Sequence, residues 1–108
     1  MAHYLVTAKP QKDLLPELRN RLKNGEIENM EPFGESLQYS LENAKLKADG
    51  GAVWEEEDYC RPPLAQERAA ILDKYFSELQ VQRVEEGKGW DQIDDLDGMF
   101  AKLLKDKK

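Results

Sequence analysis

Five apolar residues recur at alternating steps of four and three residues in the second half of the chain. They are Ala65, Ala69, Leu72, Phe76 and Leu79. This spacing places all five on one face of an α-helix, and Pro62 and Pro63 stand just ahead of it, where proline suits a helix start. A helix with one apolar face must bury that face against another element. The sequence therefore predicts a helix from residue 62 that packs on a layer built by the rest of the chain.

Short runs rich in β-forming residues stand on both sides of this helix. They cover residues 2–9, 37–46, 52–59 and 80–86. The first run alternates and stops at Pro10, which cannot continue a strand ladder. Leucines at helical spacing follow it and end at Asn24-Gly25, a left-handed helix stop. We therefore expect four strands and, between the first two, a first helix; in the last strand Val81 and Val84 share a face only if the strand contains a bulge.

The second and third runs flank Asp49-Gly50-Gly51, which predicts a β-hairpin. A loop of Asp49-Gly50 would set Leu46 opposite Val53, whereas a loop of Gly50-Gly51 would set Leu46 opposite Glu55. A one-residue slip exchanges the two faces of a strand. The hairpin sequence thus leaves open which of Val53 and Trp54 points toward the helices.

We expect residues 1–89 to form a single domain and residues 90–108 to form a helical tail. The apolar residues of the tail that suit one helical face are Trp90, Ile93, Leu96, Phe100 and Leu103. An amphipathic tail of this kind can lie back on its own domain, reach a second protomer or dock into another protein.

The resulting order is strand, helix, strand, strand, helix, strand and helical tail. It predicts an α+β fold, the ferredoxin-like β-α-β-β-α-β arrangement with both helices on one face of a four-stranded antiparallel sheet. By this order over residues 2–86, the chain resembles the superfamily of small dimeric α/β-barrel proteins. In that superfamily two such sheets pack open face to open face, so the resemblance implies a homodimer. Its members include cofactor-free monooxygenases, isomerases, haem-binding proteins and ligand-binding domains, so the resemblance implies no single activity.

Charge and composition exclude several classes of protein. The 108 residues contain 16 basic and 22 acidic side chains, for a net charge of −6. A surface of this sign does not attract phosphate, so we expect no nucleic-acid partner. The apolar runs are short, so we expect no membrane span. The first residues lack a basic region followed by an apolar one, so we expect no secretory signal. The single Cys60 suits a reducing compartment, and we expect the cytoplasm.

The densest polar cluster is the run of four acidic residues from Glu55 to Asp58 on the third predicted strand. Strand alternation sends Glu55, Glu57 and Tyr59 to one side and Glu56, Asp58 and Cys60 to the other. Two carboxyls on one side of a pocket can act as acid and base, or supply oxygen ligands to Mg²⁺ or Ca²⁺. The alternative is a solvated strand face whose charges discourage edge pairing. No second acidic motif with metal-loop spacing is present, which favours the solvated face.

A second set of residues is a candidate ligand site. It consists of Tyr39, Trp54, Glu57, Tyr59 and Arg61. Aromatic rings supply contact area for a small planar or anionic ligand, and Arg61 supplies a forked pair of donors. The competing interpretation is that these aromatic residues belong to the core or to a dimer interface.

Other catalytic devices are absent or incomplete. His3 is the only histidine, and His3 together with Cys60 supplies too few ligands for zinc. Cys60 could act as a nucleophile only if His3 lay nearby to serve as its base. The glycines form no phosphate-binding loop, and no Gly-x-Ser-x-Gly elbow occurs. We therefore expect no metal and no cofactor.

Two functions remain open from the sequence. The first is an interaction or structural protein that acts as a cytoplasmic homodimer, favoured by the missing catalytic motif and the apolar tail. The second is a cofactor-independent enzyme or small-molecule binder with a pocket between sheet and helices, in which a glutamate such as Glu57 serves as general base.

Overall fold

The computed structural model describes residues 2–58 and 61–104. Its elements in chain order are β1 (Ala2–Pro10), η1 (Lys12–Leu14), α1 (Leu15–Lys23), α2 (Gly34–Glu42), β2 (Lys45–Leu46), β3 (Ala52–Asp58), α3 (Ala65–Glu67), η2 (Arg68–Leu72), α4 (Asp73–Tyr75), β4 (Phe76–Val84), α5 (Lys88–Ile93), β5 (Asp97–Gly98) and α6 (Met99–Leu103). Residues 65–75 form one helical segment, in which the π-helical turn η2 joins α3 to α4.

The sheet has five antiparallel strands in the order β4-β1-β3-β2-β5. The long strands β1 and β3 lie at its centre and pair from Ala2 opposite Asp58 to Ala8 opposite Ala52. The chain is therefore an α+β domain, as the sequence predicts. The fifth strand was not predicted, because β5 is only two residues long and carries Gly98.

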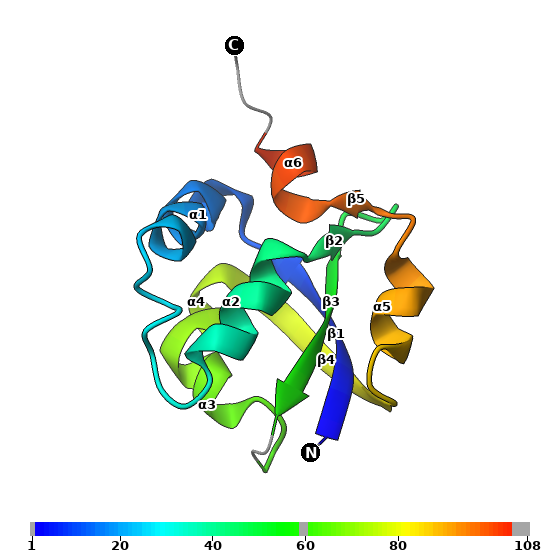
Figure 1. The fold of residues 1–108 in the computed structure, drawn as a ribbon. Coiled ribbons are helices and arrows are strands. Elements are labelled where there is room, and N and C mark those ends of the chain that lie inside the picture. Colours follow the sequence, from blue (N-terminus) through cyan, green and yellow to red (C-terminus); the bar gives the residue numbers. More distant parts are fainter. Residues whose placement is uncertain (1, 59–60, 105–108) are drawn as a thin grey trace.

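The core lies between the sheet and the helices α1 to α4, which Figure 1 shows on one side of the sheet. Val6 of β1 and Trp54 of β3 are paired across the strands, and both side chains are fully buried on this side. Leu15, Leu18 and Leu22 of α1 share the same core. Trp54 thus points toward the helices, and Val53 points to the opposite side.

The prediction of a strand over residues 37–46 is wrong for most of its length. Residues 34–42 form α2, and only Lys45–Leu46 pair as a strand. Leu37, Tyr39 and Leu41 fit a period of two, but Leu37 and Leu41 are also one helical turn apart, and these two are the buried ones. A Cβ on Gly34 would lie 2.4 Å from the Ile27 carbonyl oxygen, so α2 begins in direct contact with the preceding backbone. Contacts of this kind leave no periodic signal in the sequence.

Neither predicted hairpin register occurs. Leu46 lies opposite Ala52, and the Lys47 N–H donates to the Gly51 carbonyl oxygen at 2.8 Å. Residues 48–50 therefore form a three-residue loop, in which Gly50 adopts a positive φ of 90°. A three-residue loop with glycine in the left-handed position is a common hairpin form that two-residue patterns miss.

The helix that begins after the two prolines is shorter than its apolar stripe. It starts at Ala65 and ends at Tyr75, and Phe76 already has extended geometry and begins β4. Phe76 and Leu79 therefore reach the core from a strand rather than from the helix. The strand has no bulge between Val81 and Val84, which lie opposite Val6 and His3 in a regular ladder, so these two valines are on opposite faces. The register of β1 with β4 shifts elsewhere, between Thr7 and Lys9.

The tail is not one helix. α5 packs on the face of the sheet opposite the core, β5 pairs with β2, and Met99 of α6 is fully buried in the core. The Met99 N–H donates to the Ala44 carbonyl oxygen at 2.8 Å. The described part of the tail therefore packs on its own domain. No helix within residues 2–58 and 61–104 is long and apolar enough to cross a membrane.

Candidate functional site

The acidic residues of β3 divide between the two sides of the sheet as alternation requires. Glu56 and Asp58 point to the core side with Trp54, and Glu55 and Glu57 point to the other side. Glu55, Glu56 and Asp58 are only 4%, 1% and 4% exposed. The expectation of a solvated strand face is thus wrong for three of these four carboxyls, because helices cover both sides of this end of β3.

Glu55 holds α5 against the sheet. Its Oε2 accepts a 2.8 Å hydrogen bond from the Gly87 N–H, and its Oε1 accepts a 3.0 Å bond from the Trp90 N–H. His3 Nδ1 lies 3.4 Å from the same Oε2. A Cβ on Gly89 would come within 2.8 Å of Oε1, so glycine allows this close approach. Glu55 therefore serves as an anchor for the first turn of α5.

Glu56 is buried with an incomplete set of partners. Trp54 Nε1 donates a 2.9 Å hydrogen bond to Glu56 Oε1, while Oε2 has no partner within the described residues. Burial raises the pKa of Glu56 well above its ordinary value, and the charges of Glu67 and Asp58 act in the same direction. Burial of this carboxyl therefore disfavours its charged form in the folded protein.

Asp58 and Glu67 form a coupled pair at the end of β3. The Leu64 N–H donates a 2.6 Å hydrogen bond to Asp58 Oδ2, which orients Asp58 at the start of α3. Burial, together with the hydrogen bond and the charge of Asp58, raises the pKa of Glu67 to about 7. Glu67 is 1% exposed, and its Oε1 has no hydrogen-bond partner within the described residues. Near neutral pH the pair holds a proton that is easily gained or lost.

A cavity of about 410 Å³ adjoins this pair, and we call it the carboxyl cavity. Its wall consists of Pro32, Phe33, Ser36, Glu57, Asp58, Gln66 and Glu67. Among the described residues, the wall combines an aromatic ring with three carboxyl groups and contains no lysine or arginine. Its volume falls in the range of sites that hold small molecules.

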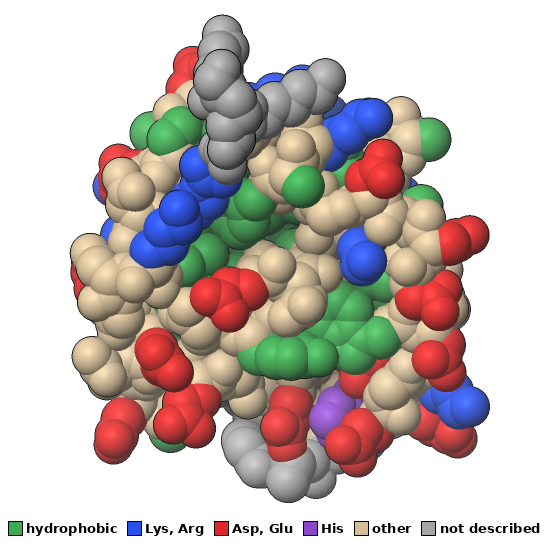
Figure 2. Space-filling model, turned by 45° about the horizontal axis from the view of Figure 1, so that its top comes forward, with side chains coloured by type: hydrophobic (Ala, Val, Ile, Leu, Met, Phe, Trp, Pro, Cys, Tyr) green, Lys and Arg blue, Asp and Glu red, His purple; other side chains and the backbone are tan. Residues whose placement is uncertain are grey.

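A second cavity of about 390 Å³ lies on the other side of β3, and we call it the aromatic cavity. Its wall consists of His3, Glu35, Ser36, Tyr39, Ser40, Glu55, Glu57, Glu86, Gly87 and Trp90. The rings of Tyr39 and Trp90 meet edge to face, with centroids 6.0 Å apart and planes at 89°. Figure 2 shows the single histidine, in purple, among acidic side chains beside an apolar patch.

The structure does not bring the sequence-predicted ligand residues together. Tyr39 is 60% exposed and lines the aromatic cavity, whereas Trp54 is fully buried in the core. Glu57 lines both cavities. Arg61 is exposed and lines neither cavity, and Tyr59 lies outside the described residues.

Glu67 was missed by the sequence analysis. Its one signal is its position four residues before the buried Ile71, which puts a carboxyl on the apolar face of the helix. The idea of a Cys60 nucleophile with His3 as its base cannot be placed, because Cys60 lies outside the described residues. His3 instead lies between Glu55 and Glu86. Within the described ranges, no three His, Cys, Asp or Glu side chains are grouped so that they could hold a metal ion.

The fold and site together describe an α+β domain with two cavities that meet at Glu57 and Ser36. Comparison with protein-family models, curated proteins and solved structures finds no match. Function is therefore inferred from the side chains of the site.

Proposed function

We propose that this chain is a small-molecule-binding protein with acid–base capacity, and that the carboxyl cavity is its site. One observation carries the proposal: Glu67 is buried in the cavity wall with Oε1 unpartnered within the described residues. A buried polar atom without a partner costs free energy, on the order of 1–3 kcal/mol, unless something supplies the missing hydrogen bond. A ligand that donates a hydrogen bond to Glu67 would remove this cost.

The chemistry available in the cavity is proton transfer. Asp58 is held by the Leu64 N–H, and Glu67 has a pKa of about 7, so the pair can accept or release one proton near neutral pH. A general acid or base works best when its pKa lies near the working pH. In this proposal Glu67 is the proton carrier and Asp58 positions it. No bound cofactor is required for such a step.

We propose further that the domain is ferredoxin-like and related in fold to the dimeric α/β-barrel proteins. The order β4-β1-β3-β2 supports this, because it is the strand order that the predicted β-α-β-β-α-β chain produces. β5 then extends the sheet beside β2, and α2 lies along β3, where a longer second strand would pair. Ser40 Oγ donates a 2.8 Å hydrogen bond to the Glu55 carbonyl oxygen on this edge.

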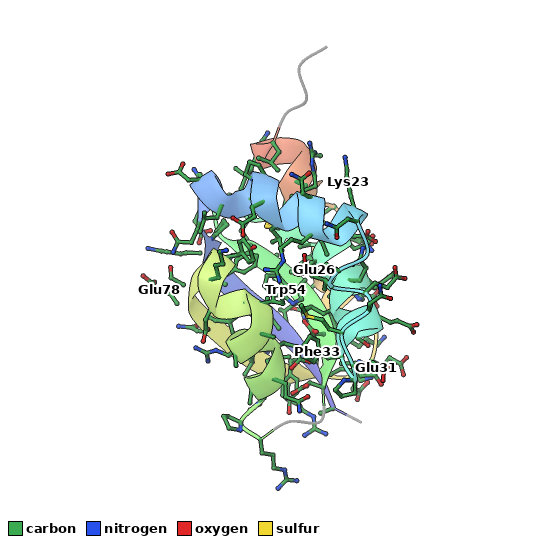
Figure 3. All side chains as sticks on the ribbon, turned by 90° about the vertical axis from the view of Figure 1, so that its left-hand side faces the viewer. Lys23, Glu26, Glu31, Phe33, Trp54 and Glu78 are labelled. Carbon is green, nitrogen blue, oxygen red and sulfur yellow. The ribbon has the colours of Figure 1, made fainter. Side chains whose placement is uncertain are left out.

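The proposed function is tested by NMR with a set of small polar molecules that includes cations, neutral amides and anions. We expect at least one of them to shift the backbone amides of Phe33, Ser36 and Gln66 and to do so less in the Glu67→Gln variant. Glu78→Gln is the matched control, since Glu78 is exposed on β4 and lies at the left edge of the molecule in Figure 3, away from Phe33. If no molecule of the set shifts these amides, the proposal is wrong.

A second candidate function is a homodimeric interaction protein, favoured by the free edge of β4. This strand is nine residues long, exposes residues 80–83 and, in the part of the chain that the structure describes, has a neighbouring strand on one side only. An unpaired edge can pair with another strand. A dimer formed face to face would meet α5, so the β4 edge is the more open surface. Light scattering on Val81→Lys and the wild type tests this, because a dimer joined at β4 would dissociate in the variant.

A further inference from the structure

We infer that the aromatic cavity binds a trimethylammonium group carried by a small molecule. This is a second site, beyond the proposed function, because neither Asp58 nor Glu67 lines the aromatic cavity. The inference rests on three properties of the wall. They are two perpendicular rings, buried polar groups that already have hydrogen-bond partners, and an excess of acidic side chains.

The rings of Tyr39 and Trp90 form a corner in the wall. Tyr39 of α2 is 60% exposed, and it meets Trp90 of α5 edge to face, with ring centroids 6.0 Å apart and planes at 89°. Two rings at a right angle allow one bound group to contact both. The face of an aromatic ring attracts a cation that lies within about 6 Å, most strongly for tryptophan. In Figure 2 an apolar patch lies beside the histidine and its acidic neighbours, so apolar surface and negative charge meet on this side of the molecule.

The buried polar groups of the wall already have hydrogen-bond partners. Ser40 Oγ donates to the Glu55 carbonyl oxygen at 2.8 Å, and the two carboxyl oxygens of Glu55 accept N–H bonds from Gly87 and Trp90. A primary ammonium group is strongly hydrated and must exchange that water for hydrogen bonds to the wall. A trimethylammonium group has no N–H to satisfy, so it can lie against the rings and leave these bonds in place. The wall therefore favours the methylated cation.

The charge of the wall favours a cation over a neutral molecule of the same shape. Among the described residues, the wall contains four glutamates, one histidine and no lysine or arginine. A positive charge on His3 would therefore still leave more acidic than basic groups. Glu35 and Glu86 are exposed, so water and salt screen their charges. The rings are thus the main source of the preference, and the carboxyl groups add to it.

The test compares choline with two molecules that each lack one of its properties. The dimethylbutanol with carbon in place of nitrogen has the shape of choline without its charge, and ethanolamine has the charge without the methyl groups. In NMR titrations we expect choline to bind about fivefold or more tightly than either. Choline should shift the indole N–H signal of Trp90. It should leave that of Trp54, which is fully buried in the core and lines neither cavity.

Variants of Tyr39 separate the effect of the ring from that of apolar contact. Tyr39→Leu should weaken choline binding about fivefold, whereas Tyr39→Phe, which keeps the ring, should bind as the wild type does. Both variants should fold, because this side chain is mostly exposed. Glu35→Gln should weaken binding about twofold, since Glu35 lines the aromatic cavity and not the carboxyl cavity. Glu78→Gln is the control and should change nothing.

A trimethylammonium group can also belong to a methylated lysine of another protein. We assign it to a small molecule because a cavity of about 390 Å³ has the volume of a small-molecule site. A short peptide that contains one trimethyllysine distinguishes the two sources. We expect the peptide to bind no more tightly than choline. Binding of the peptide about tenfold more tightly would show that the small-molecule assignment is wrong.

Several other results would overturn the inference. They are equal affinity for choline and either comparison molecule, an unmoved Trp90 signal, and unchanged choline binding in Tyr39→Leu. Shifts confined to Phe33 and Gln66 would place choline in the carboxyl cavity and would also overturn it. Phe33 and Gln66 line the carboxyl cavity and not the aromatic cavity. The inference and the proposed function are therefore tested by different signals, and the failure of one is distinguishable from the failure of the other.

Discussion

The indole of Trp54 donates a 2.9 Å hydrogen bond to the carboxyl of Glu56, two residues further along the same strand. Side chains two apart on a strand point to the same side, so both groups enter the core together, and both are almost completely buried. The bond satisfies the Trp54 N–H, which would otherwise lack a hydrogen-bond acceptor in the core. The bond lowers the pKa of Glu56, but the burial of the carboxyl outweighs it and raises this pKa well above its ordinary value.

Glu56→Gln should stabilise the protein at pH 8. The pKa of Glu56 is raised in the folded state, so the unfolded chain releases the proton first and the free energy of unfolding declines as pH rises above about 4.5. Glutamine keeps the acceptor for Trp54 without this penalty. We expect a gain in the free energy of unfolding at pH 8 that shrinks toward zero at pH 4, measured by urea unfolding. An equal loss at both pH values would contradict this account.

Glu67→Gln should flatten the pH dependence of stability between pH 4.5 and about 7. Glu67 has a raised pKa of about 7, so its contribution is complete below pH 4.5 and is lost as the pH rises through 7. We expect the wild type to lose about 2 kcal/mol more than the variant across this window, measured by urea unfolding at half-unit steps. Glu78→Gln is the control and should follow the wild-type curve. Parallel curves for wild type and Glu67→Gln would show that Glu67 does not titrate in this range.

Glu17 changes the pH dependence of stability in the opposite direction to Glu67. Its effect appears on the acid side of the same stability profile. The hydrogen bond from Lys74, then that from Tyr75, lowers the pKa of Glu17, so its contribution is present above pH 4.5 and is lost as the pH falls. Glu17 is exposed, and solvent screens this contribution. A decline in stability below pH 4.5 that persists in Glu67→Gln is therefore expected.

Gly34→Ala should be strongly destabilising. The added Cβ would lie 2.4 Å and 2.5 Å from the carbonyl oxygens of Ile27 and Glu28, and backbone atoms cannot move aside without displacing α2. We expect a loss of about 3 kcal/mol in urea unfolding, since overpacking against fixed backbone is among the costlier substitutions. Gly98→Ala is the matched control, because its nearest neighbour would be 3.8 Å away. A near-neutral Gly34→Ala would mean that the contact of α2 with residues 27–28 is loose.

The helices and strands that the sequence predicts correctly are those that bury one side against a single layer of the fold, because this leaves a regular pattern of apolar residues. β1 alternates because only one of its sides enters the core, and α1 shows Leu15, Leu18 and Leu22 because it lies on one face of the sheet. α2 was taken for a strand because only two of its buried residues, Leu37 and Leu41, are large and apolar, while Gly34, Gln38 and Ser40 are buried without an apolar side chain to mark the helical face. Burial of small and polar residues depends on tertiary packing, which the local pattern does not encode.

The candidate site was only partly predictable for a related reason. The alternation of Glu55, Glu56, Glu57 and Asp58 was correct, but a run of charges gives no sign that helices from distant sequence cover both sides. The helical carboxyl of Glu67 comes to Asp58 through the turn at Leu64, which adopts a positive φ of 65°. Nothing in the residue type of Leu64 predicts that conformation.

Glu55→Ala should free α5 without unfolding the core. The substitution removes the acceptor for both the Gly87 and Trp90 N–H groups, and a charged acceptor of this kind contributes about 1.5–3 kcal/mol per bond. Hydrogen exchange measured by mass spectrometry should therefore become much faster in residues 87–93, while β1 and α1 keep their protection. Glu57→Ala is the control on the same side of β3, since this half-exposed side chain makes no such bond to α5. If exchange rises equally in α1 and α5, Glu55 supports the whole fold. If exchange in residues 87–93 stays at the wild-type rate, the packing of Ile93 and the contact between Trp90 and Tyr39 suffice to hold α5 in place.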